Sequence, residues 1–434
     1  MVNTREIVLD CIMEILEKKQ YSHYVMKQVL DKYGYLDKQE RSFIKRVTEG
    51  TVERCLEMDY IINSFSKVPV KKMKPLIRSL MRMSVYQLLY MDSIPDSAVC
   101  NEAVKLANKR GFSPLKGFVN GVLRNIARNK EKIEYPDREK EPVSYLSVVY
   151  SMPEWIVEMW LSRFGGEKTE QILKGLLSGR PVTIRLEEGL SSKEKEELLQ
   201  KITCEGIETE QVQGLPYAYR LKNLDRVETI PGFAEGLVMI QDAGSMEIIE
   251  LADIKEDQYI IDVCGAPGGK ALHAAGKMKN TGFVTVRDIS QRKVELMEDN
   301  IARSGYGNIK AEVFDATVLD EENVEKADVV IADLPCSGLG VIGRKGDIKY
   351  RVTKEDVINI AALQQKILSV VWQYVKPGGK LIYSTCTLTE EENEKNTAWF
   401  LEQFPFHKEK EKTLIPGIQE TDGFYMAVLR RDRS

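Results

Sequence analysis

Residues 259–277, YIIDVCGAPGGKALHAAGK, decide the fold of the larger part of this chain. The apolar run at 259–264 is typical of a buried strand, and the residues after Lys270 have the composition of a helix. Glycines at such a turn let the backbone approach a ligand closely, and the helix N-terminus offers free N–H groups. The stretch therefore predicts a strand–turn–helix unit with a binding loop.

Similar units continue to the C-terminus. Further apolar strands are predicted at 282–288, 310–315, 327–333 and 379–385, and helical runs lie at 290–304 and 357–375. Alternation of this kind predicts an α/β domain with a parallel sheet and helices on both faces. In such sheets the ligand crevice lies at the carboxyl ends of the strands, where the polar motifs of this sequence fall.

The remainder divides into two smaller parts. Up to residue 130 the apolar residues recur at helical spacing, as in Ile7, Val8, Cys11, Ile12, Ile15 and Leu16, which predicts an all-α domain. A charged linker with two prolines follows at 129–142, and helices mixed with short strands predict a small α+β module up to 235. We predict three domains, at 1–140, 141–235 and 236–434.

Composition narrows the class of protein. The chain has 434 residues, 43% of them apolar and 29% charged, which is typical of a soluble protein. No apolar run reaches the ~18–20 residues that span a bilayer, and the N-terminus lacks a signal-peptide pattern. Seven scattered cysteines and three histidines exclude a disulfide framework, a zinc motif and a Ser-His-Asp triad. A cytoplasmic protein with no membrane partner and no metal is expected.

Charge is unevenly distributed. Residues 1–130 hold 23 Lys and Arg against 14 Asp and Glu, a net charge of +9, and the remainder carries −13. A basic module on an acidic body suggests that one end binds a polyanion such as RNA. The alternative is a Lys-rich helical face that is merely solvated.

The glycine loop fits one class of cofactor best. A phosphate-binding loop of the Walker type would need Gly and Ser or Thr where Cys264 and Ala271 stand, and Pro267 occupies the middle glycine of a dinucleotide fingerprint. A methyltransferase-type loop for S-adenosylmethionine remains. Asp288, ending the next strand, is then placed for the ribose, and Asp315, ending the third strand, for the adenine edge. The alternative is that both are ordinary polar strand-end residues.

Two cysteines follow predicted strands of the same sheet. Cys336 lies in DLPCSGLG (333–340) and Cys386 in STCT (384–387), each among small polar residues that are unusual around core cysteines. A thiolate that adds to C6 of a pyrimidine makes C5 nucleophilic enough to accept a methyl group. Asp333 is placed to stabilise the charge that develops on the base, which must be unstacked to enter such a pocket. These arguments leave open which cysteine attacks.

With these motifs the chain resembles the RNA cytosine-C5 methyltransferases of the Sun/Nop family. The matching stretches are 240–242, DVCGAPGGK (262–270), Asp288, Asp315, DLPCSGLGVIGRKGDIKYR (333–351) and YSTCTLTEEENE (383–394). Residues 1–130 resemble a NusB-type RNA-binding domain. Gly265 and Ala271 stand where Ala and Thr are commoner in the family, and Arg287 stands where a small residue is usual, which could alter cofactor affinity.

The resemblance implies a fold, a reaction and a set of roles. The C-terminal domain would be Rossmann-like, and the enzyme would form 5-methylcytosine in 16S ribosomal RNA, either naked or in early assembly. Cys386 would be the nucleophile, Cys336 the product-release cysteine and Asp333 the base-activating group. The cofactor-binding residues would be Cys264, Gly265, Ala266, Pro267, Gly268, Gly269, Lys270, Asp288, Asp315 and Asp333. The alternatives are the same chemistry on transfer RNA or 23S ribosomal RNA, or a non-catalytic RNA-binding assembly factor.

Overall fold

The computed structural model describes residues 3–179 and 181–433, which form two compact units. Unit 1 comprises the chain up to residue 177 together with 344–351, and unit 2 comprises 178–343 and 352 onward. Each unit is described separately below. The predicted domain boundaries at 140 and 235 stay predictions.

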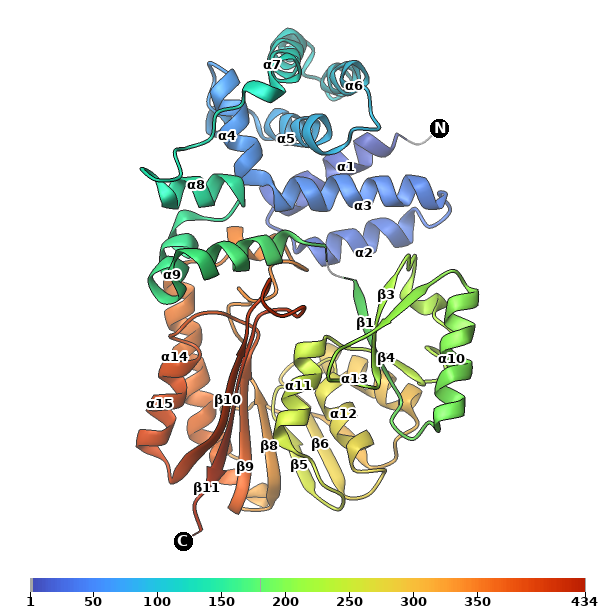
Figure 1. The fold of residues 1–434 in the computed structure, drawn as a ribbon, viewed down its shortest axis with the longest axis vertical. Helices are drawn as coiled ribbons and strands as arrows, with labels where there is room; N and C mark the ends of the chain where they lie inside the picture. Colours follow the sequence, from blue (N-terminus) through green and yellow to red (C-terminus); the bar gives the residue numbers. More distant parts are fainter. Residues whose placement is uncertain (1–2, 180, 434) are drawn as a thin grey trace. The chain divides into compact units, whose positions relative to one another are not determined.

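Unit 1 is built from helices throughout its described residues, as the apolar spacing predicts. Its α-helices (Figure 1) are α1 (Thr4–Ile12), α2 (Ser22–Lys32), α3 (Lys38–Glu53), α4 (Cys55–Phe65), α5 (Pro75–Tyr90), α6 (Asp96–Lys109), α7 (Lys116–Arg128), α8 (Pro142–Val149) and α9 (Glu154–Leu177). The short helices are η1 (Met13–Glu17), η2 (Val70–Lys72), η3 (Ser113–Leu115), η4 (Lys130–Lys132) and η7 (Ile348–Tyr350). The predicted apolar stripe from Ile7 to Ile15 lies in the core of this unit.

The thiols of unit 1 are structural. Cys11, Cys55 and Cys100 are buried, and burial raises the pKa of Cys11 to about 11. A thiol that stays protonated and packed among apolar side chains is unreactive. None of these three is therefore a candidate nucleophile.

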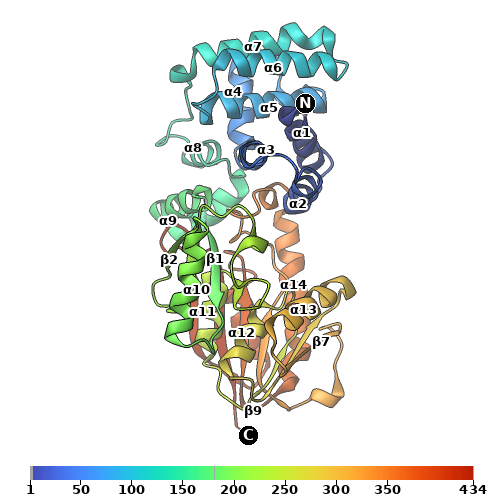
Figure 2. The ribbon, with the colours of Figure 1, turned by 90° about the vertical axis from the view of Figure 1, so that its right-hand side faces the viewer.

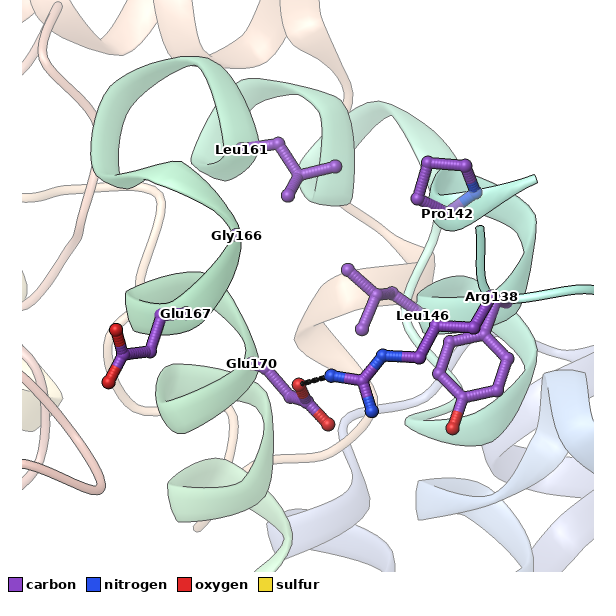
Figure 3. A pocket seen from close by; sticks show the side chains of 8 residues that line it. Arg138, Pro142, Leu146, Leu161, Gly166, Glu167 and Glu170 are labelled. Atoms are coloured by element: carbon purple, nitrogen blue, oxygen red, sulfur yellow. Dashed lines mark hydrogen bonds and ion pairs between the residues drawn. The ribbon is translucent and has the colours of Figure 1, made fainter. Parts of the chain in front are cut away.

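A pocket of about 330 Å³ lies between α8 and α9 in unit 1. Helix α9 bends at Gly165, where φ is +75°, and Arg138 forms a 2.5 Å ion pair with Glu170 at the pocket wall (Figure 3). The phenol of Tyr150 donates a 2.8 Å hydrogen bond to the same carboxylate. None of the predicted site residues lines this pocket.

Unit 2 begins with a small antiparallel sheet in the order β2-β3-β1-β4. Its elements are β1 (Val182–Leu186), α10 (Ser192–Cys204), β2 (Glu208–Gln211), β3 (Ala218–Lys222), η5 (Val227–Thr229) and β4 (Val238–Ile240). The side chain of Ser191 accepts a hydrogen bond from the backbone N–H of Glu194, and the carboxylate of Glu194 accepts one from the backbone N–H of Ser191, so a capping box starts α10. The expected mixture of helices and short strands is confirmed.

The large sheet of unit 2 has the order β10-β11-β9-β8-β5-β6-β7. Its strands are β5 (Tyr259–Asp262), β6 (Phe283–Asp288), β7 (Ile309–Val313), β8 (Ala327–Asp333), β9 (Val375–Thr385), β10 (Phe406–Leu414) and β11 (Phe424–Arg431). The pairings among β5 to β9 are parallel, as predicted. The sheet as a whole is mixed, because β11 pairs antiparallel with both β9 and β10.

The two antiparallel strands show where strand prediction was incomplete. Strand β10 is the sheet edge, and its residues FHKEKEKTL are mostly exposed, so they lack an apolar pattern. Charged residues on an edge strand discourage pairing with another chain. Strand β11, which lies inside the sheet, is almost entirely buried.

Helices cover both faces of this sheet, which confirms the predicted α/β architecture (Figures 1 and 2). One apolar core lies under α11 (Ala243–Ala252), α12 (Gly269–Lys277) and α13 (Gln291–Ser304), and the other under α14 (Lys354–Val371) and α15 (Glu394–Gln403). The remaining short helices are η6 (Glu321–Asn323) and η8 (Trp372–Tyr374). Across residues 3–179 and 181–433, no helix combines the length and apolarity needed to cross a membrane.

Candidate active site at the strand ends

The predicted site residues of unit 2 gather at one edge of the large sheet. Parallel register places Asp262 of β5 opposite Ile331 of β8, and Asp333 of β8 opposite Ser384 of β9. Since parallel strands end on the same side, the loops after β5, β6, β8 and β9 all leave from this edge. The arrangement brings the predicted residues to one edge of the sheet, and the ligand crevice there stays a prediction.

The glycine loop is tightly folded after β5. The N–H of Gly265 donates to the carbonyl of Arg287 at 2.8 Å, and the N–H of Gly268 donates to the carbonyl of Gly265 at 2.6 Å. Gly268 has φ +100°, a conformation that favours glycine, and it precedes α12 without a side-chain cap. The first N–H groups of α12 are therefore presented by the loop rather than covered by a capping side chain.

Gly265 is required by its surroundings. A Cβ there would lie 2.7 Å from the carboxyl group of Asp262 and 2.3 Å from Val286. An Ala at this position would need both of these side chains to shift. This departure from the family pattern thus accompanies a close approach between the loop and Asp262.

Asp262 is an acid that lies in the interior of the site. It is fully buried at the end of β5. The pKa of Asp262 is raised to about 7, chiefly by burial; the charge of Lys270 opposes the rise and that of Asp333 adds to it. A group with this pKa exchanges its proton near neutral pH, so a bound cation would favour its charged form.

Lys270 and Asp333 form the central ion pair of the site. The ammonium of Lys270 donates to one carboxylate oxygen of Asp333 at 2.5 Å, and the hydroxyl of Ser384 donates to the other at 2.8 Å. Burial disfavours the charge on Lys270, but attraction to Asp333 and the hydrogen bond outweigh it and raise the pKa of the lysine. Asp333 is thereby held as an oriented carboxylate beside the two cysteine loops.

The strand-end acids Asp288 and Asp315 lie in different surroundings. Asp288 is buried, and it accepts the backbone N–H of Ser290 at 3.0 Å and the ammonium of Lys293 at 3.1 Å. Asp315 lies just beyond β7 and accepts the N–H and hydroxyl of Thr317, both at 2.8 Å, which lowers the pKa of its carboxyl group. Their cofactor contacts stay predictions.

The side chains of Cys336 and Cys386 are in contact. The sulfur atoms of Cys336 and Cys386 are 3.0 Å apart, and the backbone N–H of Cys386 donates to the sulfur of Cys336 at 3.3 Å. Both are reduced and partly buried. Contact with Cys386 and burial raise the pKa of Cys336 well above its ordinary value. A thiol that holds its proton beside another sulfur is poorly suited to be the attacking thiolate, but it can exchange protons with an adduct formed next to it.

Backbone contacts hold the Cys336 and Cys386 loops close together. The N–H of Gly340 donates to the carbonyl of Cys386 at 3.1 Å, and a Cβ at Gly340 would lie 2.8 Å from that carbonyl oxygen and 2.2 Å from the carbonyl oxygen of Gly423. The glycine is therefore needed for the two cysteine loops to approach.

Glu392, a buried carboxylate that the sequence motifs did not single out, joins the two cysteine loops through hydrogen bonds. Glu392 accepts the N–H of Ser337 at 2.8 Å and the hydroxyls of Ser337 and Thr389 at 2.5 and 2.8 Å, and Ser337 also contacts Thr387 at 2.7 Å. Ser337 follows Cys336 and Thr387 follows Cys386, so Glu392 connects both loops. Burial raises the pKa of Glu392, whereas its hydrogen-bond donors oppose the rise.

The same network extends into α14 and α15. The amide of Gln364 donates to Glu392 at 3.2 Å, and the phenol of Tyr383 and the amide of Asn396 donate to Gln364 at 3.0 and 2.8 Å. All of these side chains are buried. The only sequence signal for Glu392 was its place in the TLTEEENE run after Cys386.

The unusual Arg287 points away from this network. Its guanidinium forms ion pairs with Glu312 at 2.6 Å and Asp320 at 2.5 Å, and it lies 4.4 Å from the ring centre of Phe314. Successive residues of a strand face opposite sides, so Arg287 and Asp288 diverge.

Cys264 in the glycine loop is half-buried, and burial raises the pKa of its thiol well above the usual range.

The fold and site together define a methyltransferase-type α/β domain with paired cysteines, joined to helical and small α+β modules. Three family models match the chain: "16S rRNA methyltransferase RsmB/F" over 249–430, "NusB family" over 2–128, and the "Methyltr_RsmF/B-like, ferredoxin-like domain" over 152–228. A "Probable ribosomal RNA small subunit methyltransferase B" of Bacillus subtilis is 35% identical and covers 99% of each chain. The chain belongs to the RsmB/F family of 16S rRNA methyltransferases.

Solved structures agree on the fold. The protein PH0851 superposes with a TM-score of 0.82 over 99% of each chain at 24% identity. NSun6 from Pyrococcus horikoshii, solved with the ligand SFG, has a TM-score of 0.58 at 23% identity and covers 66% of this chain and 100% of its own. At these identities the likeness concerns the fold alone.

Proposed function

We propose that this protein transfers a methyl group from S-adenosylmethionine to C5 of a cytosine in 16S ribosomal RNA. The observation that carries the proposal is the 3.0 Å contact of Cys336 and Cys386 beside the Asp333 carboxylate at the strand ends. A methyltransferase acting on an amino group needs no thiol, whereas an unreactive ring carbon does. Family membership supports ribosomal RNA as the substrate class.

The residues present fit the cofactor. S-adenosylmethionine carries a sulfonium and an ammonium charge, and the edge of the sheet holds the acids Asp262, Asp288 and Asp333. The Gly268–Lys270 turn supplies uncapped backbone N–H groups, and Asp288 and Asp315 are placed for ribose and adenine. When bound, the cofactor supplies the methyl group.

Covalent catalysis assigns a separate task to each cysteine. The thiolate of Cys386 adds to C6 of the cytosine, so that a sulfur–carbon bond forms and the electron pair of the C5–C6 double bond becomes available at C5. After methylation, Cys336 takes the proton from C5 and passes its own proton to the sulfur of Cys386, as the bond from that sulfur to C6 breaks and the C5–C6 double bond returns. The carboxylate of Asp333, held by Lys270 and Ser384, accepts a hydrogen bond from the 4-amino group of the base and so orients the ring for addition.

The basic N-terminal helices would hold the RNA through its phosphates. Their net charge of +9 over residues 1–130 contrasts with the acidic remainder. The small sheet of unit 2 would help to hold the target stem-loop.

Mapping 5-methylcytosine tests the proposal. Bisulfite sequencing of ribosomal and transfer RNA should show one 16S cytosine that loses methylation when the gene is deleted and recovers it with the wild-type protein but not with Cys386→Ala. Recovery by Cys386→Ala would overturn the assigned nucleophile. A lost site in transfer RNA or 23S RNA would instead show the same chemistry on another substrate.

A further inference from the structure

Residues 344–351, the second half of the 333–351 motif, take no part in the catalytic site. Residues 344–351 leave unit 2 and pack within unit 1. Asp347 accepts the backbone N–H of Ser22 at 3.3 Å and also the Ser22 hydroxyl, and Lys349 donates to the carbonyl of Glu53 at 2.7 Å. Both charged side chains are almost fully buried, at 3% and 1% exposure. Such anchors fix this segment against α2 and α3.

These anchors place two cations beside the first turn of α2. The guanidinium carbon of Arg351 lies 3.9 Å from the ring centre of Tyr21, and Arg351 also donates to the carbonyl of Lys19. Lys345 is an exposed residue of the same segment, two residues before the Asp347 anchor at Ser22. Burial and the charges of Lys345 and Arg351 lower the pKa of His23, whereas the charge of Asp347 raises it. Positive charge from 344–351 is thus added to an aromatic surface.

The aromatic rings on this surface are unusually exposed. Tyr21 is 56% and Tyr24 39% exposed, and the ring of His23 lies 5.7 Å from that of Tyr21 and 6.1 Å from that of Tyr24. Large aromatic side chains gain most of their free energy from burial, so a row of them in solvent indicates a binding surface. We call Tyr21, His23, Tyr24, Lys345 and Arg351 the α2 platform.

We propose that the α2 platform binds an unpaired segment of RNA, with bases stacked on its rings and phosphates paired with its two cations. Aromatic rings interleaved with Lys and Arg are the usual means of holding single-stranded nucleic acid, and arginine against a ring strengthens the stack. A paired helix hides its base faces, so this surface selects unpaired nucleotides. The inference rests on the proposed function, since it takes RNA as the substrate, and adds which form of RNA unit 1 holds.

Binding by the full chain tests this. Fluorescence anisotropy would compare a labelled 12-nucleotide single strand of mixed sequence with a 12-base-pair RNA duplex. Tyr21→Leu and Tyr24→Leu should each weaken binding of the single strand about tenfold, in the range of one base–aromatic stack. Tyr21→Phe should retain it. Tyr35→Leu is the matched control, because Tyr35 is 71% exposed in unit 1 but lies outside the platform.

Charge is tested separately. Lys345→Gln should lower the slope of log affinity against log salt by about one phosphate contact, without changing the preference for single strands. The proposal is overturned if the tyrosine variants bind the single strand as well as Tyr35→Leu does, or if they lose duplex and single-strand affinity equally.

Methylation distinguishes failure of this inference from failure of the proposed function. If wild-type protein binds the single strand through the platform but methylates no cytosine, the proposed function fails and the platform stands. If the wild-type protein methylates 16S RNA while the platform variants bind the single strand normally, only the inference about the α2 platform fails.

Discussion

Residues 333–343 and 344–351 are neighbours in one motif, yet they belong to different compact units. The first half carries Asp333, Cys336 and Gly340 and is held by buried hydrogen bonds that fix sulfur and carboxylate positions. The second half is held by Asp347 and Lys349 and leaves Lys345 and Arg351 at an aromatic surface. Chemistry requires a rigid and partly dry setting, whereas RNA capture requires exposed rings and charge.

The two halves of one continuous motif therefore act in different ways. The catalytic half works through precise distances, so small displacements should change turnover. The other half works through contact area and charge, so its substitutions should change affinity and salt dependence. The predictions below test that division, beginning with the largest expected effect.

Cys336→Ala should lower turnover by about 10²–10⁴-fold, the range for loss of a positioned proton-transfer group. The covalent bond between Cys386 and the cytosine would then persist, so a protein–RNA band should appear on a denaturing gel. The Cys336→Ala, Cys386→Ala double variant should give no such band. An adduct formed by Cys386→Ala alone would reverse the two roles.

Glu392→Gln should lower kcat about tenfold to a hundredfold, because displacement of reacting groups by about 1 Å has effects of this size. Each carboxylate oxygen accepts two hydrogen bonds, and an amide nitrogen in place of either oxygen would face donors. Cofactor affinity, measured by calorimetry, should change little.

Glu390→Gln is the matched control for this effect, since Glu390 is an exposed neighbour of Glu392 on the same segment. Equal loss of kcat in both variants would show that the network does not position the cysteines. Thermal unfolding of both variants separates a catalytic effect from a loss of fold.

Cofactor affinity should rise as the pH increases through about 7, by at most about tenfold per pH unit. Burial raises the pKa of Asp262 to about 7, and a positively charged cofactor favours its ionised form, which is lost as pH falls below that value. The same shift means that the folded chain binds more protons than the unfolded chain between about pH 4 and 7, so this group's contribution to stability falls as pH rises there. Calorimetry at pH 6, 7 and 8 should show a flatter profile for Asp262→Asn, and an unchanged slope would contradict the assignment.

Asp347→Ala should lower the free energy of unfolding of unit 1 by about 0.5–2 kcal/mol, since its carboxylate caps α2, which has no cap from its own N-cap residue. It should also weaken binding of single-stranded RNA. Asp37→Ala removes the side-chain cap of α3 in the same unit without touching the platform. Chemical denaturation should show similar losses of stability for both variants. A similar loss of RNA affinity in both would show that the weaker binding comes from lost helix capping and not from a change in the platform.

The strand-end motifs could be predicted because each one depends on local chemistry. An apolar run followed by a glycine turn favours a strand, a loop and a helix, so the sequence predicts Asp288 and Asp333 at strand ends and Gly268 in the loop before α12. Strand β10 was missed because an exposed, charged edge strand carries no apolar signal. Glu392 was missed as a functional residue because only burial distinguishes it from the acids beside it.

What the sequence alone determined is therefore the set of chemical groups: two thiols, a glycine loop and acids after apolar strands, together with a basic helical region. Only the tertiary structure decided that the sulfurs of Cys336 and Cys386 are 3.0 Å apart, that Glu392 connects their loops, and that 344–351 packs on helices of unit 1. The reason is physical: local periodicity specifies which face of an element is apolar, whereas distances between residues 50 or 300 positions apart depend on how whole elements pack.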